Sequence, residues 1–225
     1  NARNAKTARE KAAELRAEAA KAEARRKTIT AVAAVIAVLV VAVVATILVR
    51  TASDNSAAKT AAAAKPPANL SDGGVLAGNT TAKVTIEVYE DFLCPACKQG
   101  ELANAAQMEQ WAKDGTAKVI YRPVSILDRA TTPEGYSSRA LNAAAVVMDT
   151  KPSAFAAFHK LLFDNQPAEG SAGLTDDQLI EYAVQAGCDK AAVEAPIRDQ
   201  KFKVWAAAQT DEFSKKGYTG TPTYV

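Results

Sequence analysis

Histidine and cysteine are scarce in this sequence of 225 residues, which contains one histidine and three cysteines. Three cysteines are too few for the disulfide framework of a small secreted scaffold. A structural zinc site needs four ligands. Beside Cys94 and Cys97, only Cys188 and His159 could supply cysteine or histidine ligands, and neither has the spacing of a zinc site. We therefore expect no metal site.

A large excess of charge of one sign is also absent. The 27 Lys and Arg residues nearly balance the 25 Asp and Glu residues, and the formal net charge is +2. The composition gives no indication of a nucleic-acid partner. The charge is nevertheless uneven, because residues 1–27 contain nine Lys or Arg residues and four Glu residues.

Residues 1–27 have the Ala-, Glu-, Lys- and Arg-rich composition of a helix. Leu15 is their only large apolar residue, so such a helix has no apolar face to bury. Two interpretations remain open. We favour a solvated, charged helix in the cytoplasm over an arm that docks on a partner.

Residues 28–49 contain no charged residue and are rich in Val, Ala, Ile and Leu. A helix over this segment would be roughly 33 Å long, enough to cross the hydrocarbon core of membrane lipid. The apolar region of a cleaved signal peptide, the alternative, is normally about 7–15 residues long. Basic residues cluster at 25–27, whereas Arg50 stands alone at the other end. The positive-inside rule predicts a single-pass transmembrane helix with residues 1–27 in the cytoplasm and the C-terminal part outside.

Residues 50–74 are rich in Ala, Ser and Lys, and they include Pro66-Pro67 and Gly73-Gly74. This composition is typical of an extended, flexible linker without a core. We expect it to hold the following domain away from the membrane.

Residues 75–225 carry the patterns of a globular α/β domain. Alternating apolar residues predict a strand at Val84–Tyr89, a helix at Gln99–Lys113 and a second strand at Lys118–Val124. Such a strand–helix–strand unit favours a parallel pair of strands. The pattern is helical from Pro133 to about Ser214, and a strand-like segment, Thr223–Val225, follows.

Between the first strand and its helix lies the sequence Cys94-Pro95-Ala96-Cys97. Two cysteines at this spacing suit reversible thiol–disulfide chemistry. Cys94 precedes the helix, where unpaired N–H groups and the helix dipole favour a thiolate, and Pro95 suits the first helical turn. Cys97 lies inside the helix, where it can attack a mixed disulfide at Cys94. Half of a zinc site and a purely structural disulfide remain less favoured alternatives.

The sequence resembles the DsbA-type branch of the thioredoxin superfamily over about residues 75–225, as a thioredoxin-like fold with an all-helical insertion. The residues that carry the resemblance are Asp91-Phe92-Leu93-Cys94-Pro95-Ala96-Cys97, the insertion segment from Phe155 to Pro167 with Phe158, His159, Leu162, Phe163 and Gln166, and Thr219-Gly220-Thr221-Pro222-Thr223. With the apolar segment and linker in front, the chain looks like the membrane-tethered versions common in actinobacteria.

The resemblance implies a role for each site residue. Cys94 would be the attacking thiolate and Cys97 the resolving thiol, with Pro95 and Ala96 modulating them. Pro222 would follow a cis peptide bond and lie against the cysteines, and the backbone of Thr221 would pair with a substrate peptide as an added strand. The plainer alternative for Pro222 is an ordinary proline of an edge strand.

The sequence departs from the family pattern at three places. Ala96 stands where strongly oxidising members have His, so we expect a less depressed pKa at Cys94 and a weaker oxidant. Val88 stands where the family often has a buried acid, between Glu87 and Glu90, which leaves proton transfer to Cys97 unexplained. The family also continues beyond the position of Val225 with a strand and a helix, so we expect a C-terminal end that is missing here.

We expect structural rather than catalytic roles for His159 and Cys188. His159 lies in an apolar helical stripe, so we expect a buried, hydrogen-bonded structural histidine rather than a general base. Cys188 suits a buried, inert thiol. An intermolecular disulfide at Cys188 remains open, because the compartment is expected to be oxidising.

Two functions are compatible with the sequence. The first is an extracytoplasmic, membrane-tethered thiol–disulfide oxidoreductase that acts on exported thiol proteins through Cys94 and Cys97 without a cofactor. The alternative is a thioredoxin-like accessory subunit or assembly factor of a multi-subunit membrane complex, such as a respiratory supercomplex, with little or no redox turnover.

Overall fold

The computed structural model describes residues 65–78 and 80–225. The predicted cytoplasmic helix of residues 1–27, the predicted transmembrane helix of residues 28–49 and most of the predicted linker lie outside the described residues. Within the described residues, no helix has the length and apolar character needed to cross a membrane.

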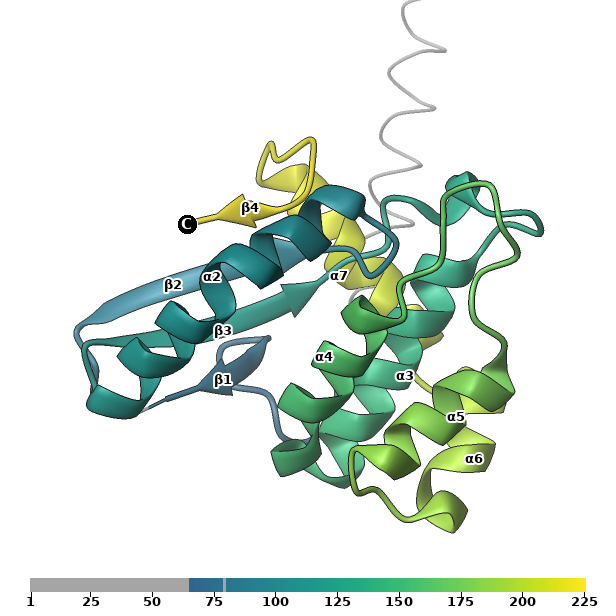
Figure 1. The fold of residues 1–225 in the computed structure, drawn as a ribbon, viewed down its shortest axis with the longest axis horizontal. Coiled ribbons are helices and arrows are strands. Elements are labelled where there is room, and N and C mark those ends of the chain that lie inside the picture. The colour runs from purple at the N-terminus through teal and green to yellow at the C-terminus, as the bar shows by residue number, and fades with distance from the viewer. Residues whose placement is uncertain (1–64, 79) are drawn as a thin grey trace, which may run out of the picture. The chain divides into compact units, whose positions relative to one another are not determined.

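One sheet lies at the centre of the thioredoxin-like part, and its described strands follow the order β1-β3-β2-β4 (Figure 1). The middle strands β2 and β3 are parallel, as the sequence predicted, whereas β1 and β4 run antiparallel to their neighbours. The strands are Val75–Ala77 (β1), Val84–Glu90 (β2), Ala117–Pro123 (β3) and Thr223–Tyr224 (β4).

Helix α2, Pro95–Asp114, connects β2 to β3 and lies along one face of the sheet (Figure 1). It begins four residues earlier than the sequence pattern indicated, because Pro95 occupies its first turn. It ends at Gly115, whose φ of 78° is a left-handed conformation that glycine adopts without strain.

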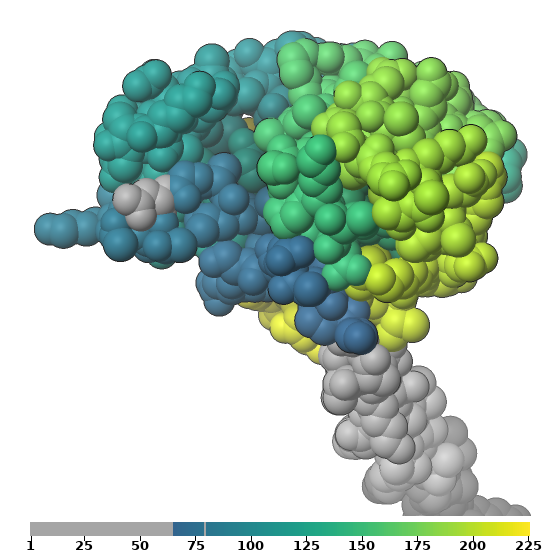
Figure 2. Space-filling model, turned by 90° about the horizontal axis from the view of Figure 1, so that it is seen from below, coloured from purple at the N-terminus to yellow at the C-terminus, as the bar shows by residue number. Residues whose placement is uncertain are grey.

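The helical insertion forms the second half of the domain. Helix α3 is its centre, and eleven of the side chains of α3 are buried, including Leu141 and Met148. Figure 2 shows the helical half, coloured green to yellow, beside the sheet half in blue and teal, with a hollow between them. The helices are α3 (Tyr136–Thr150), α4 (Phe155–Asp164), α5 (Asp176–Gln185), α6 (Lys190–Arg198) and α7 (Lys203–Lys215), with short 3-10 turns at Asp128–Ala130 and Pro152–Ala154.

The described end of the predicted linker is bound to the domain. Pro67 is buried. The backbone N–H of Ala68 donates to Asp149 Oδ1 over 2.8 Å, and the Asn69 amide donates to the Met148 carbonyl over 3.2 Å. Within residues 65–74 the chain therefore has fixed contacts with the C-terminal end of α3, which the composition alone did not indicate.

Candidate functional site

The two cysteines of the Cys-Pro-Ala-Cys turn meet at the start of α2. Cys94 is the N-cap residue, and its sulfur accepts a hydrogen bond from the backbone N–H of Cys97 over 3.4 Å. The side chains are 6% and 3% exposed, and both thiols are free, so the structure represents the dithiol state. On the other side, the backbone N–H of Asp91 points to Cys97 Sγ over 3.5 Å.

The pKa values of the two thiols are shifted in opposite directions. The Cys97 thiol donates to the Cys94 sulfur, which is the largest reason why the pKa of Cys94 falls to about 5. The Thr221 hydroxyl and the N–H groups of Cys97 and Ala96 act in the same direction, and burial opposes them. The same hydrogen bond holds the proton on Cys97 and raises the pKa of that thiol, and burial adds to the rise. At neutral pH these shifts favour Cys94 as the thiolate and Cys97 as the thiol, and the catalytic roles predicted for them stay a prediction.

Thr221 and Pro222 lie directly against this pair. The Thr221–Pro222 peptide bond is cis, as the resemblance implied. The Thr221 carbonyl oxygen lies 3.3 Å from Cys94 Sγ and can accept only from the protonated thiol. The Thr221 carbonyl and hydroxyl thus act in opposite directions, because the hydroxyl favours the thiolate. The predicted pairing of the Thr221 backbone with a substrate stays a prediction.

The side chain of Asp91 stabilises the reactive turn through hydrogen bonds. Its carboxylate is fully buried and accepts from the N–H of Leu93 over 2.9 Å, the N–H of Leu127 over 3.0 Å and the hydroxyl of Ser137 over 2.7 Å. Burial raises the pKa of Asp91 to about 6, although the three donors favour the charged form. The carboxylate therefore joins the turn to α3 and to the loop after β3.

A family model described as thioredoxin matches residues 70–225. The chain belongs to the thioredoxin family.

Solved structures place the chain within a branch of the thioredoxin family. DsbA from Mycobacterium tuberculosis is 30% identical, with a TM-score of 0.59 over 68% of this chain and 81% of that protein. The disulfide bond oxidoreductase DsbG from the same organism is also 30% identical, with a TM-score of 0.59 over 74% and 81%. BdbD from Bacillus subtilis, at 21% identity, shares the fold with a TM-score of 0.62 over 71% and 85%. The resemblance to DsbA-type oxidoreductases, including actinobacterial ones, is confirmed.

The chain also matches a curated relative of a different kind. A segment of 124 residues is 30% identical to part of the serine/threonine-protein kinase PknE from Mycobacterium tuberculosis. The match covers 53% of this chain but only 22% of that kinase, so the chain spans about a fifth of the length of the curated relatives it matches.

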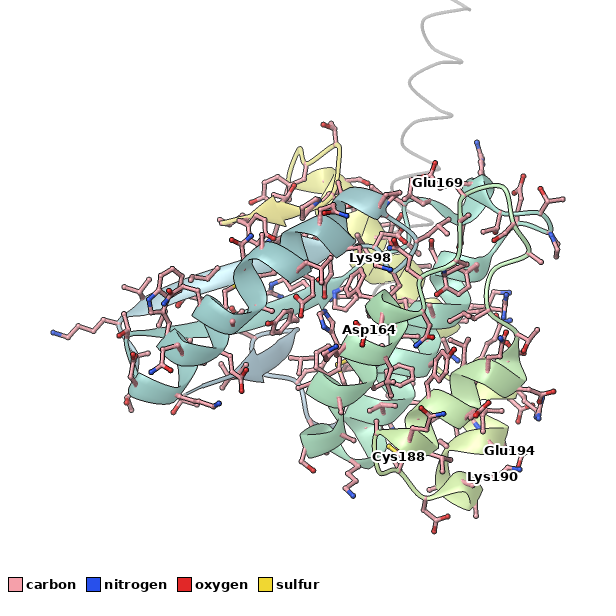
Figure 3. All side chains as sticks on the ribbon, in the orientation of Figure 1. Lys98, Asp164, Glu169, Cys188, Lys190 and Glu194 are labelled. Carbon is pink, nitrogen blue, oxygen red and sulfur yellow. The ribbon has the colours of Figure 1, made fainter. Side chains whose placement is uncertain are left out.

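The insertion also touches the reactive turn of this thioredoxin-family domain. The Gln166 amide, which follows α4, donates to the carbonyl of Phe92 over 3.1 Å and to that of Cys94 over 2.9 Å. Nearby, the Lys98 ammonium of α2 donates to the Asp164 carbonyl over 3.3 Å, and Figure 3 labels both residues where α2 and α4 approach. Sequence reasoning gave Gln166 no role, although it was part of the segment that carried the resemblance.

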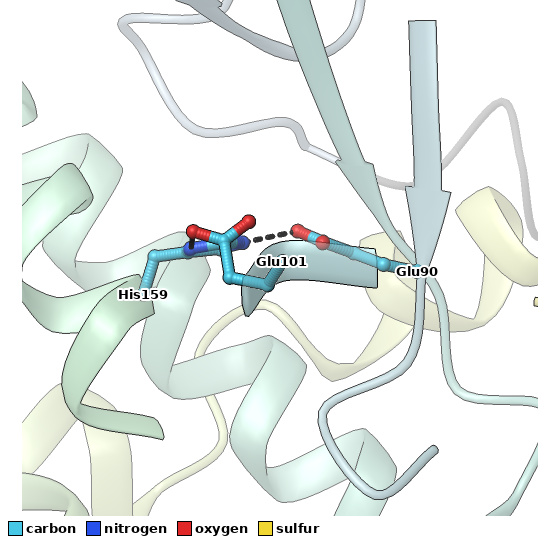
Figure 4. A group of neighbouring side chains, drawn as sticks. All are labelled: Glu90, Glu101 and His159. Carbon is cyan, nitrogen blue, oxygen red and sulfur yellow. Dashed lines mark hydrogen bonds and ion pairs between the residues drawn. The ribbon is translucent and has the colours of Figure 1, made fainter. Parts of the chain in front are cut away.

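Three ionisable side chains lie close to one another: Glu90, Glu101 and His159 (Figure 4). His159 Nε2 lies 2.5 Å from Glu90 Oε1, and His159 Nδ1 lies 3.6 Å from Glu101 Oε1. The imidazole is 3% exposed and packs among the rings of Phe92 and Tyr121. Burial lowers the pKa of His159, but the two carboxylates outweigh it and the net shift is upward. The predicted buried, hydrogen-bonded histidine is confirmed, whereas the two glutamates were not foreseen as its partners.

Cys188 is separate from these groups. It follows α5 (Figure 3). The residue is 5% exposed, and burial raises the pKa of its thiol. The predicted burial is confirmed, and a raised pKa makes the thiol a poor nucleophile at neutral pH.

Proposed function

We propose that the chain is a thiol–disulfide oxidoreductase in which Cys94 is the nucleophile and Cys97 the resolving thiol. The single observation that supports this most strongly is the position of Cys94 as the N-cap of α2, where its sulfur accepts from the backbone N–H of Cys97. A low pKa keeps Cys94 reactive, and the proton on Cys97 keeps the second thiol inactive until it is needed.

Cys94 and Cys97 alone can carry out both steps of the exchange with a substrate disulfide. The Cys94 thiolate attacks one sulfur of a substrate disulfide, and the other substrate sulfur leaves as a thiolate. Cys97 then loses its proton and attacks Cys94, which releases the second substrate thiolate and leaves a Cys94–Cys97 disulfide. Two electrons have passed to the substrate. In the opposite direction, the oxidised pair accepts two electrons from a substrate dithiol.

Stabilisation of the Cys94 thiolate favours that second direction. A group that stabilises the reduced state of the pair makes its disulfide a stronger oxidant. We therefore propose that the chain oxidises substrate thiols, and that a partner with a higher reduction potential restores its disulfide. The expectation that Ala96 weakens the oxidant relative to members with His at that position stays a prediction.

The location and the substrate class are part of the proposal. The apolar segment of residues 28–49, with basic residues 25–27 before it, supports a domain held outside the cell by a single-pass anchor. Exported proteins with paired thiols would then be the substrates. The alternative of an accessory subunit in a membrane complex stays a prediction.

The test is oxidation of a peptide that carries two cysteines. The oxidised chain should convert it to the disulfide, and Cys94→Ser should abolish the reaction. Cys188→Ser is the matched control, because it also removes one buried thiol, and it should retain the parent rate. Oxidation by Cys94→Ser at the parent rate would refute the proposed chemistry. Labelling of the same domain in intact cells by a reagent that does not cross membranes tests the location separately.

A further inference from the structure

We propose that Glu90, Glu101 and His159 form a binding site for a single Zn²⁺ ion. The three residues come from different elements, β2, α2 and α4, and their side chains point toward one another (Figure 4). Each offers one ligand atom, and these atoms lie within 4.8 Å of one another. The site is distinct from the redox pair, so the inference does not depend on the proposed function.

The donor set fits zinc in particular. One imidazole nitrogen and two carboxylate oxygens are ligands that Zn²⁺ takes in sites with three protein ligands and one open position. Calcium and magnesium prefer a shell of oxygen atoms only. The sequence analysis considered only cysteine and histidine as zinc ligands, so it did not include Glu90 and Glu101.

The charges also favour a dication. The carboxylate of the buried Glu90 and that of the partly buried Glu101 lie close together, so they repel each other when both are charged. Cationic side chains nearby are already engaged. Lys160 pairs with Asp164 over 2.5 Å, and Lys113 pairs with Glu109 over 2.6 Å. A zinc ion would neutralise both glutamates.

Binding requires both carboxylates to meet at one nitrogen of the imidazole. Ligand atoms around a tetrahedral zinc ion lie about 3.3 Å apart, given bonds of about 2 Å. Glu90 Oε1 lies 2.5 Å from Nε2 of His159, whereas Glu101 Oε1 lies 3.6 Å from Nδ1, so the two carboxylates face different nitrogens of one ring. Only one nitrogen binds the ion, so the carboxylate of Glu101, whose ligand atom lies within 4.8 Å of the others, would move toward the nitrogen that binds it. The ion would displace the proton that Glu90 and His159 share, and this proton would leave to solvent.

A groove between α2 and α4 provides access. Its volume is about 700 Å³, and both Glu101 and His159 line it. A water molecule in the groove could fill the fourth position on the metal. Aromatic side chains of Tyr121, Phe155 and Phe163 surround the imidazole and fix its orientation. Zinc bound here would join α4 of the insertion to α2 and β2 of the sheet half.

The experiment uses the full chain, treated with a chelator and oxidised so that Cys94 and Cys97 form a disulfide and cannot bind metal. Calorimetric titration with ZnCl₂ at pH 7 should show one ion per chain. Glu101→Gln should weaken binding about tenfold or more, because it removes one ligand. Glu109→Gln, which changes an exposed glutamate on the same helix and groove rim, should leave the affinity unchanged.

A second measurement keeps the test independent of how the variants fold. X-ray absorption at the zinc edge of the parent chain should show a shell of nitrogen and oxygen atoms with the scattering of one imidazole. A sulfur shell, or the absence of stoichiometric binding, would overturn the proposal. Equal affinity in the parent and Glu101→Gln would overturn it as well, and would leave the cluster as a proton-sharing ion pair.

Discussion

The hydrogen bond from the Cys97 thiol to the Cys94 sulfur is the largest cause of the low pKa of Cys94, so removing it should have a large effect. Cys97→Ala removes this donor and leaves the N–H groups at the start of α2 in place. Cys97→Ser is the matched variant, because its hydroxyl can donate to the Cys94 sulfur in the same way.

The size of the effect follows from the chemistry of the contact. A hydrogen bond to a charged group contributes about 1.5–3 kcal/mol, and one pKa unit corresponds to about 1.4 kcal/mol. Cys97→Ala should therefore raise the pKa of Cys94 by about one to two units from its value of about 5. Cys97→Ser should keep the pKa close to that of the parent.

The pKa is measured from the rate of alkylation of Cys94 as a function of pH, since only the thiolate reacts. Cys188→Ser in every variant removes the remaining thiol from the assay. If Cys97→Ala titrates at the parent pH, the thiol hydrogen bond is not the main cause. The backbone donors and the helix dipole would then account for the acidity of Cys94.

Three further outcomes are expected. The folded pKa of Cys94, about 5, lies below its usual value of about 9, so the thiolate stabilises the reduced chain fully above about pH 9, and this stabilisation is lost as the pH falls through 5. The free energy of unfolding from urea titration, reduced minus oxidised, should be about 3 kcal/mol larger at pH 7.5 than at pH 4.5. Gln166→Ala should cost about 1–3 kcal/mol of stability and slow thiol exchange, because two hydrogen bonds to the turn are lost. Gln185→Ala, which removes an exposed amide that donates to the Glu181 carboxylate, should do neither. Tyr136→Phe should be neutral or stabilise the chain by up to about 1 kcal/mol in thermal unfolding, because the buried Tyr136 hydroxyl has no partner among the described residues.

Local patterns predicted the central unit of the fold well. The alternation in β2, the glycine after α2 and the short apolar run of β3 act within a few residues, and the structure confirms all three elements. Strand β1 was not predicted, because its three residues carry too little pattern. Its strand conformation depends on pairing with β3, where Val75 lies opposite Tyr121 and Ala77 opposite Val119.

The reactive turn could also be predicted, because its chemistry is contained in adjacent residues. The groups that support the turn could not, because they arrive from distant parts of the chain. Gln166 follows the insertion helix α4, and Ser137, which bonds to Asp91, belongs to α3. The pairing of His159 with Glu90 likewise joins α4 to β2. No spacing in the sequence indicates such contacts, which depend on how the insertion packs on the sheet half.

The absence of an acid at Val88 left the proton of Cys97 without an obvious acceptor, and the structure gives a physical answer. A buried acid is present two residues later on the same face of β2, at Glu90, but its hydrogen bond goes to His159. The largest cause of the raised pKa of Cys97 is its hydrogen bond to the Cys94 sulfur. Once Cys94 is bonded to a substrate sulfur, it is no longer an anion and holds that proton far less strongly. We therefore expect formation of a mixed disulfide to lower the pKa of Cys97, although burial still raises it, and to favour the proposed resolving step without an acid at position 88.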